Sequence, residues 1–574
     1  MQHVGDATPR KRGLASLRRR LFRAETPLLA GTVVLIGYLT LLPLGYLLWQ
    51  AFFDDGTFTL DFFREAYAAY GLGELAWNSL VFAFGSTVLA VTVGTALAYV
   101  VVRTDVPWRT LLFVAALVPL IVPGVLYTIA WIFLASPRTG ALNKLLEPLF
   151  GPGKIDVFSM WGMILVEGLH LAPLAFLLMA AAFRSMDPAL EEAAVTSGAR
   201  PLTAFWRVTL PLMRPALSAS ILILAIRAVE AFEVPALLGL PDGTWVFTSR
   251  IWRSLGEYPP AFGQAGAYAL SLLTLALIGV LAHTILSRRG RSFQTVTGKG
   301  FRPRPVRLGA WRWPALAAVL AYVAVAAVLP LLVLFYVSTQ PFYSSVSLEG
   351  LSQMTLESYR QLLGDEQLLG AARNSLLLGV GCATAVMLSM AVVSWLLVRT
   401  RIRGRWLVDG LAFLPIAIPG LVLGVALLII YLRAPVPVYG TLWILFIAYF
   451  TRFMPYGIRS SSISMAQVGR ELEESAHVCG ASWWSTFRRV LLPLMLPGLV
   501  AGWIYIMLVS LRELSTSILL YSPGNEVLSI VIWERYENGA FPELAALGML
   551  MVLVTGALAA AAYRLSIKRG VRGV

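Results

Sequence analysis

The sequence predicts an all-α polytopic membrane protein with about twelve transmembrane helices, arranged as two homologous six-helix repeats. Three observations support this fold class: the composition, the positions of the basic residues and an internal duplication. Of the 574 residues, 58% are hydrophobic and only 13% are charged, whereas roughly a quarter of the residues in a soluble globular domain are charged. The formal net charge of +15 does not indicate a nucleic-acid partner, because the basic residues cluster at the ends of apolar runs.

Long apolar runs define the predicted spans. A helix needs about 20 predominantly apolar residues to cross a bilayer, and a spanning segment must satisfy its own backbone hydrogen bonds, which favours helices over open strands. The first run is longer than the apolar core of a signal peptide, about 7–15 residues, so we expect it to be retained. The runs lie near residues 27–51, 77–102, 110–134, 159–183, 213–238, 264–287, 313–337, 373–398, 407–432, 441–458, 495–520 and 543–566.

The charges of the loops predict the orientation. Cytoplasmic loops carry an excess of Lys and Arg, so the basic tail at residues 1–26 places the N-terminus in the cytoplasm. The next loop, 52–76, carries five acidic residues against a single Arg64, as expected for an external loop. The loop at 136–158 fits least well, because it contains three basic residues. An even number of spans then places both termini on the cytoplasmic side.

The second half of the chain repeats the first, at one constant offset in the early elements and at a smaller one at the later cassettes. Asn78-Ser79-Leu80 recurs as Asn374-Ser375-Leu376, Arg103-Thr104 as Arg399-Thr400, and Pro123-Gly124 as Pro419-Gly420. A repeat of half the chain length indicates two homologous units packed about a pseudo-symmetry axis. The predicted parts are a cytoplasmic basic tail at 1–26, a first repeat at 27–287, a cytoplasmic linker at 288–312 and a second repeat at 313–574.

A short polar cassette occurs once in each repeat, on the predicted cytoplasmic side. Glu192-Ala193-Ala194 is followed by Gly198 and Leu210-Pro211, and Glu474-Ser475-Ala476 is followed at the same spacing by Gly480 and Leu492-Pro493. Gly commonly ends a helix, so each cassette is predicted to be a short helix, a tight turn and a second short helix. The alternative is an ordinary amphipathic loop with solvated acids, but such a loop gives no reason for two copies at identical spacing.

The cassette resembles the signature of the permease subunits of binding-protein-dependent ABC importers, and the second copy departs from it only at Ser475. The resemblance covers nearly the whole chain, as two tandem permease units, and implies the type I ABC importer permease fold in a bacterial cytoplasmic (inner) membrane. It implies that each cassette is a coupling helix that docks on a cytoplasmic ATP-binding subunit, present in two copies. It also implies that a periplasmic or lipid-anchored binding protein delivers the substrate. The implied docking residues are Glu192, Ala193, Ala194, Gly198, Pro211, Glu474, Ser475, Ala476, Gly480 and Pro493.

A fused pair of permease units of this length resembles the ferric-iron importer permeases, which implies ferric iron as the substrate. The segments Thr59-Leu60, Thr355-Leu356 and 235–239 add to this resemblance. Thiamine, phosphonate and polyamine permeases look similar and remain alternatives. An ion-coupled secondary transporter also has about twelve spans in two halves and is an alternative from another class, but it has no need of two cytoplasmic cassettes.

The chain has no sequence motif for a motor or an active site of its own. A phosphate-binding loop needs Gly, four residues, and then Gly-Lys followed by Ser or Thr, and neither Gly153-Lys154 nor Gly298-Lys299 fits this pattern. We therefore expect no catalytic residue and no bound cofactor, with ATP and Mg²⁺ held by the partner ATPase. The two cysteines, Cys382 and Cys479, do not have metal-ligand spacing, and no metal site is predicted.

Charged residues within spans are costly in a bilayer, so they are candidates for a translocation path. Glu230 and Glu233 lie three residues apart, which predicts that they share one face of one helix. The alternative is that the charges pair with each other across helices and only fix the packing. Carboxylate oxygens suit ferric iron, a hard cation, but in this importer class the binding protein normally selects the substrate. The candidates are Glu167, His170, Arg227, Glu230, Glu233, Arg452, Arg512 and Glu513.

Overall fold

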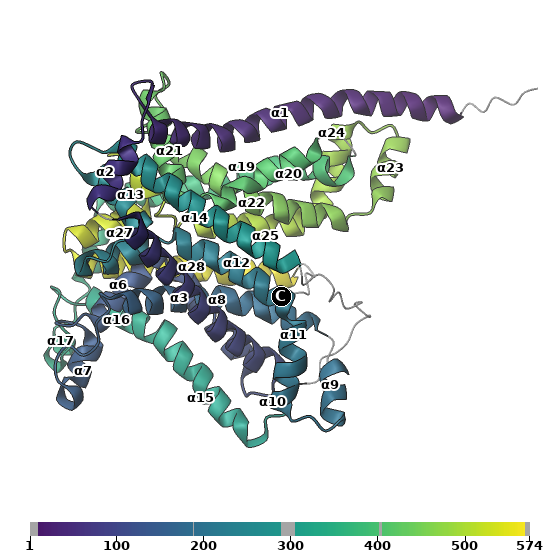
Figure 1. The fold of residues 1–574 in the computed structure, drawn as a ribbon. Helices are drawn as coiled ribbons and strands as arrows, with labels where there is room; N and C mark the ends of the chain where they lie inside the picture. Colours follow the sequence, from purple (N-terminus) through teal and green to yellow (C-terminus); the bar gives the residue numbers. More distant parts are fainter. Residues whose placement is uncertain (1–9, 70, 187–188, 289–304, 401–403, 569–574) are drawn as a thin grey trace, which may run out of the picture.

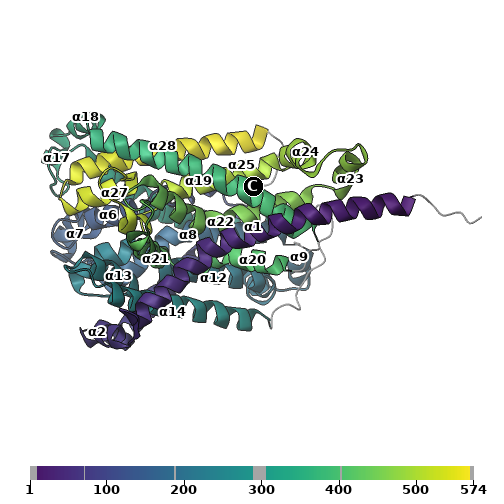
Figure 2. The ribbon, with the colours of Figure 1, turned by 90° about the horizontal axis from the view of Figure 1, so that it is seen from above.

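The computed structural model describes residues 10–69, 71–186, 189–288, 305–400 and 404–568, and most of them are helical. The only sheet in this part of the chain is an antiparallel hairpin of β1 (Phe53–Asp54) and β2 (Thr57–Phe58). Long helices run side by side as a bundle, and short helices and loops gather at its two ends (Figure 1, Figure 2). The predicted all-α membrane fold is therefore confirmed.

Eight helical segments are long and apolar enough to cross a membrane, and three further helix pairs pass the same test but are bent. The described residues thus contain up to 11 candidate spans. One more long helix, α22 (Leu442–Gln467), carries Arg452 and Arg459 and occupies the position of the remaining predicted span. The eight segments include α1 (Arg10–Phe52), α3 (Leu72–Ala98), α8 (Met160–Ser185), α14 (Phe262–Arg288), α15 (Arg312–Val323) with α16 (Leu329–Ser338), α19 (Glu366–Arg399), α25 (Leu492–Ser510) and α28 (Phe541–Lys568).

Shorter elements connect or interrupt these helices. In the first half they are α2 (Asp61–Ala69), η1 (Tyr99–Arg103), α4 (Arg109–Ala115), α5 (Val118–Ile121), α6 (Gly124–Ala135), α7 (Ala141–Phe150), α9 (Ala189–Thr196), α10 (Pro201–Ala204), η2 (Phe205–Thr209), α11 (Leu210–Leu212), α12 (Arg214–Glu230), η3 (Pro235–Gly239), η4 (Leu240–Asp242) and α13 (Phe247–Gly256). In the second half they are η5 (Gly309–Trp311), η6 (Ala324–Val328), α17 (Leu348–Ser352), α18 (Glu357–Leu363), α20 (Arg405–Phe413), η7 (Leu414–Ala417), α21 (Gly420–Arg433), α23 (Arg470–Val478), α24 (Trp483–Thr486), η8 (Phe487–Leu491), α26 (Ser517–Leu520) and α27 (Leu528–Glu537).

The predicted tail and linker are described only in part. α1 already begins at Arg10, within the predicted tail, and residues 1–9 lie outside the described residues. α14 ends at Arg288, and the chain is described again from residue 305, so residues 289–304 of the predicted linker also lie outside. The division into tail, repeats and linker therefore stays a prediction.

The third predicted span of each repeat is broken rather than straight. α4–α5 and α6 meet at 96°, and α20–η7 and α21 meet at 105°. Each break falls at the repeated pair, Pro123-Gly124 or Pro419-Gly420, which begins the second helix. A proline disfavours the helical conformation of the residue before it, and Val122 and Ile418 are accordingly extended, with ψ of 127° and 113°. The prediction of two continuous spans here is therefore wrong.

The fifth predicted span of each repeat, 213–238 or 495–520, is also interrupted. α12 ends at Glu230 and α25 ends at Ser510. Ala231 is extended, with ψ of 132°, and its carbonyl oxygen accepts a hydrogen bond from the Thr248 hydroxyl at 2.9 Å. Irregular backbone at membrane depth is tolerated only where protein buries it or where it lines a cavity. Both interruptions therefore mark the interior of the bundle.

The first helix of each repeat lies against the other repeat. α1 packs along α14 of its own repeat and along the broken helices α20 and α21 of the second, where the hydroxyl oxygens of Tyr38 and Tyr431 lie 3.3 Å apart. α16 packs in the same way against α28 and α6, and the Tyr343 hydroxyl donates a hydrogen bond to Thr139 at 3.2 Å. The two repeats are therefore interlocked in one bundle.

Extensive helix contacts within each repeat join the second and fourth spans, α3 with α8 and α19 with α22. Small residues allow helices in a membrane to approach closely. Gly94 of α3 faces Ala172 and Ala175 of α8, and a Cβ atom at Gly94 would lie 2.7 Å from the Ala172 carbonyl oxygen. The α3–α8 contact therefore requires glycine at this position.

We expect Gly94→Leu to destabilise the protein by about 1–3 kcal/mol or more, because overpacking a close contact forces helices apart. The measurement is the thermal unfolding temperature of the purified protein in detergent. Gly279→Leu in α14 is the matched control, since nothing lies within 4 Å of a Cβ atom added there. Equal unfolding temperatures for the two variants would contradict the close packing.

Candidate docking helices and transport cavity

The two cassettes form the helix–turn–helix units that the sequence predicts. α9 and α23 are followed by Gly198 and Gly480, whose φ angles of +91° and +81° lie in the left-handed region that favours glycine. Each turn closes with an equivalent backbone hydrogen bond of 3.0 Å, Ala199 to Ala194 and Ala481 to Ala476. Both cassettes lie at the same end of the bundle, whereas α2 and α17 lie at the other end (Figure 1).

The predicted docking residues lie mostly on the exposed surface of the cassettes. Glu192 and Glu474, the first residues of the two triplets, are both exposed, so both carboxylates are accessible to a partner. Docking itself stays a prediction. The other exposed members are Ala193, Gly198, Ser475, Gly480 and Pro493, and the partly buried ones are Ala194, Pro211 and Ala476.

The glutamate before each triplet attaches its cassette to the bundle. Glu191 is buried and pairs with Arg103 of η1, with 2.5 Å between nitrogen and oxygen. Glu473 pairs with Arg399 of α19 at 3.5 Å and accepts a hydrogen bond from the Trp395 indole at 2.9 Å. The sequence prediction missed both pairs. The recurrence of Arg103 as Arg399 and of Glu191 as Glu473 was the available signal.

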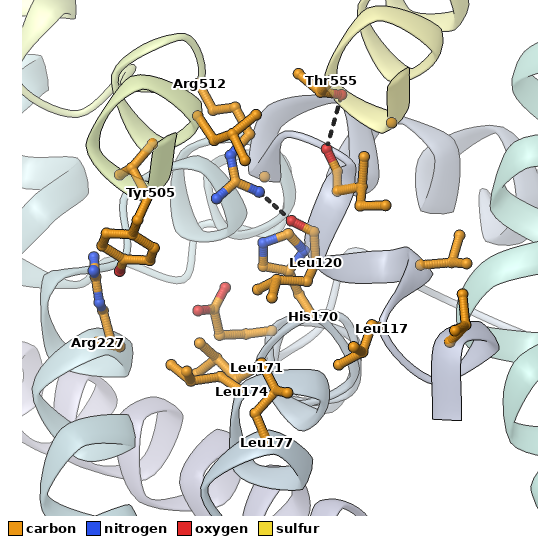
Figure 3. A pocket seen from close by; sticks show the side chains of 18 of the residues that line it. Leu117, Leu120, His170, Leu171, Leu174, Leu177, Arg227, Tyr505, Arg512 and Thr555 are labelled. Carbon is orange, nitrogen blue, oxygen red and sulfur yellow. Dashed lines mark hydrogen bonds between the residues drawn. The ribbon is translucent and has the colours of Figure 1, made fainter. Parts of the chain in front are cut away.

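A cavity of about 1300 Å³ lies between the two repeats, and all eight candidate path residues line it. Its walls come from α4, α5, α8 and α12 of the first repeat and from α22, α25 and α28 of the second. Figure 3 shows His170, Arg227 and Arg512 around this space. Several leucines of α8, including Leu171 and Leu174, form an apolar part of the wall.

Four of the eight candidates form one ion network. Arg227 pairs with Glu230 at 2.8 Å and donates a hydrogen bond to the Tyr456 hydroxyl at 2.6 Å. Arg452 joins Glu230, at 3.6 Å, to Glu513, at 3.3 Å. The alternative interpretation of these charges, that they pair and fix the packing, therefore describes these four residues. Because Arg227 and Glu230 belong to the first repeat, the network also links the repeats.

The other four candidates lie outside this network. Arg512 donates a hydrogen bond to the carbonyl oxygen of Leu120, next to the break between α5 and α6 (Figure 3). The ring of His170 lies 5.0 Å from that of Tyr127, measured between centroids, and its Nδ1 atom has no hydrogen-bond partner among the described residues. In the same part of the chain, no ion pair involves Glu167 or Glu233. The cavity thus contains two carboxylates without an ion-pair partner there.

The prediction that Glu230 and Glu233 share one helix face is wrong. α12 ends at Glu230, and the extended conformation of Ala231 separates it from Glu233. Arg512 and Glu513 likewise lie beyond the end of α25. These charges line the cavity from interrupted helices, because the freed backbone and the charged side chains both require a polar interior.

Two interlocked homologous repeats, a cavity between them that contains buried charged residues, and two exposed cassettes at one end define a multi-pass membrane transport protein. Residues 86–292 and again 385–570 match the family described as "Binding-protein-dependent transport system inner membrane component". The chain belongs to this family. It is therefore an inner-membrane transport subunit and not itself an enzyme.

Two ferric transport permeases match this chain over both repeats, and a polyamine permease matches a smaller part of it. The Fe(3+)-transport system permease protein FbpB 2 of Haemophilus influenzae is 26% identical over 536 residues, which cover 91% of this chain and 95% of that protein. The ferric transport system permease protein FbpB of Actinobacillus pleuropneumoniae is 23% identical over 92% of this chain and 76% of its own length. The spermidine/putrescine transport system permease protein PotC of Escherichia coli is 26% identical over 35% of this chain and 75% of its own length.

Among solved structures, a bacterial ABC transporter involved in the import of alginate aligns with 45% of this chain and 94% of its own chain. The sequence identity is 18% and the TM-score is 0.37, values too low to support an argument about function.

We expect Arg452→Ala to destabilise the protein by about 3–5 kcal/mol, because it leaves Glu230 and Glu513 buried without their shared partner. Thermal unfolding of the purified protein measures the effect. The control is Arg360→Ala, which removes an exposed ion pair with Glu357 and is expected to cost about 1 kcal/mol or less. A similar loss for both variants would contradict the role of Arg452 in joining the repeats.

Proposed function

We propose that this chain is the permease of an ABC importer that moves ferric iron into the cytoplasm. The observation that carries the proposal is the similarity to an Fe(3+)-transport system permease over 91% of this chain and 95% of the relative. That similarity spans both repeats. Because one chain contains both halves of the bundle, a single copy supplies the whole pathway of each complex.

Two copies of a cytoplasmic ATP-binding subunit dock on α9 and α23 in this proposal. Its support is that both cassettes lie at one end of the bundle (Figure 1) and that the Glu192 and Glu474 side chains are exposed. The ATPase subunits bind ATP and Mg²⁺, and the permease itself binds no cofactor. The N-terminal part of α1 extends toward the same end (Figure 1), which supports a cytoplasmic location for both termini.

A loaded binding protein, periplasmic or lipid-anchored, docks at the opposite end. Loop 52–76, predicted to be external, contains α2; with an even number of spans and both termini inside, loops 239–262 and 338–372, which contain α13 and α17, lie on the same side. These helices lie at the end of the bundle away from the cassettes (Figure 1). The acidic character of the first of these loops agrees with an external position.

Transport follows alternating access. ATP closes the two ATPase subunits, the cassettes follow, and the repeats rock about their interface so that the cavity opens toward the binding protein. Hydrolysis returns the repeats to the inward-facing arrangement. Arg452 has one acidic partner on each repeat, Glu230 on the first and Glu513 on the second. It therefore retains a counter-ion when the repeats separate, which keeps the charge compensated in both states.

Ferric iron is a hard cation that prefers oxygen ligands, and the carboxylates of Glu167 and Glu233 offer such ligands in the cavity. Among the described residues, however, no group of three or more His, Cys, Asp or Glu side chains is arranged to hold a metal ion. In this proposal the cavity is a passage that offers weak carboxylate contacts, and the binding protein selects the substrate. A polyamine, thiamine or phosphonate would follow the same mechanism. An ion-coupled secondary transporter would work without an ATPase.

We expect cells that lack this gene to lose radioactive iron uptake and to regain it with the wild-type chain but not with the double variant Glu192→Arg, Glu474→Arg. The reversed charges face the proposed ATPase subunits and prevent docking. Unlabelled ferric iron, thiamine and a polyamine serve as competitors. Asp409→Arg, a charge reversal at an exposed residue of α20, is the control.

Uptake that survives in the double variant would reject ATPase docking and favour the secondary transporter. Unchanged iron uptake in cells without the gene would reject iron as the substrate. Uptake of labelled thiamine, phosphonate or polyamine by cells with and without the gene would then identify the substrate class.

A further inference from the structure

We propose that the buried ion pair Arg103–Glu191 and the partly buried ion pair Arg399–Glu473 are the joints that pass movement of the cassettes to the transmembrane helices. The four side chains touch neither substrate nor nucleotide, so they are positioning residues. The inference rests on the proposed function, because it assumes that an ATPase moves the cassettes.

The first joint connects α9 to the end of the second span. The side chains of Arg103 and Glu191 are only 2% and 7% exposed. The Nε and Nη1 atoms of Arg103 have no hydrogen-bond partner among the described residues, so Glu191 provides most of the compensation for this buried charge. Tyr99, one turn before Arg103, donates a hydrogen bond to Glu191 at 3.5 Å and packs edge-on against Phe205 of η2, with 4.7 Å between centroids.

The second joint has the same arrangement of an arginine, a glutamate and an aromatic hydrogen-bond donor, but the aromatic residue is a tryptophan. Trp395 stands in α19 where Tyr99 stands in the first repeat, one turn before the arginine, and donates a hydrogen bond to Glu473 at 2.9 Å. It also packs edge-on against Trp483 of α24, with 5.0 Å between centroids. Each joint therefore consists of an arginine, a glutamate, and an aromatic donor that contacts the second helix of the cassette.

The joints are the principal attachment of the first cassette helix to the second span. Among the side chains of α9 that the structure describes, Glu191 alone is buried, and no residue of α23 is fully buried. A cassette held by apolar packing could slide, because packing is not directional. In the first joint, the charge-assisted hydrogen bond from Arg103 to Glu191 fixes both distance and orientation, which a joint that transmits movement requires.

Each joint leads directly to the cavity. α3 packs against α8 and α12, which carry Glu167, His170, Arg227 and Glu230. α19 packs against α22 and α25 in the same way, and α22 carries Arg452. A displacement of Arg103 or Arg399 therefore moves the helix that supports the cavity wall.

The first joint is further stabilised by residues 306–308, in the described part of the predicted linker. The Val306 amide donates a hydrogen bond to the Arg103 carbonyl oxygen at 2.7 Å, and the Asp105 amide donates one to Val306 at 3.1 Å. The Leu308 amide bonds the Asp105 carboxylate at 2.8 Å. The first joint is also more buried than the second, whose side chains are 7% and 14% exposed. The two joints are therefore unequal, and the first is the stiffer.

The test uses the complete complex of permease, ATPase subunits and binding protein in proteoliposomes. We expect Glu191→Gln to retain the ATPase subunits and basal ATP hydrolysis but to lower iron uptake about tenfold, as loss of a charge-assisted bond predicts. Stimulation of hydrolysis by the binding protein should be lost in parallel. Glu473→Gln should show the same pattern with a smaller loss of iron uptake.

Lys144→Ala, at an exposed ion pair with Glu147, is the control. Wild-type uptake and stimulation in Glu191→Gln would overturn the proposal.

A second variant covers the case in which Glu191→Gln does not fold. Arg103→Cys with Glu191→Cys, in a Cys479→Ser background because Cys479 is exposed, is compared before and after a short bis-maleimide cross-link. Before cross-linking, the double-cysteine variant should hydrolyse ATP with little iron uptake. After the cross-link joins the two cysteines, the same sample should recover iron uptake. No change in uptake on cross-linking would overturn the proposal.

Failure of the proposed function has a different signature. If Glu192→Arg with Glu474→Arg leaves the ATPase subunits bound and transport intact, docking at the cassettes is rejected, whatever Glu191→Gln does. Loss of coupling in Glu191→Gln with the ATPase subunits still bound supports the joints alone.

Discussion

Arg452 holds together the part of the molecule where its helices are interrupted. It bonds Glu230, the last residue of α12, and Glu513, just beyond the end of α25. A charge at membrane depth is costly unless it is paired, and interrupted backbone is tolerated there only inside the protein or along a cavity. The same network therefore satisfies both requirements. The polar cavity and the contact between the repeats depend on it.

The duplicated helices form a nearly symmetric scaffold. The residues that line the cavity between the repeats are not symmetric. Both repeats carry the Pro-Gly break, the left-handed glycine turn and the buried Arg–Glu pair. The cavity residues differ at equivalent positions, since Glu230 corresponds to Arg512 and His170 to Arg452. The first repeat contributes most of the acids. Symmetric mechanical parts suit the two copies of an ATPase subunit that we propose, whereas an asymmetric path gives a single substrate distinct contacts.

The mechanical link that we propose is short and contiguous. An ion pair connects each cassette to the end of the second span of its repeat. That span packs against the helices that form the cavity wall. Coupling of this kind needs elements that move as rigid bodies. The interlocked first helices, α1 and α16, support this because each contacts both repeats. The loops that we propose to be external lie at the far end of the same helices (Figure 1).

The sequence alone determined what depends on local pattern: the apolar spans, the duplication, the glycine turns of the cassettes and the charged residues that fall within the apolar runs. Tertiary structure decided which charges pair, where the fifth span of each repeat ends, and that Glu191 is buried while its neighbour Glu192 is exposed. Adjacent residues on a helix point in different directions. Only the packing of distant helices decides which of two neighbouring glutamates meets Arg103, because burial and pairing are long-range properties that no local pattern contains.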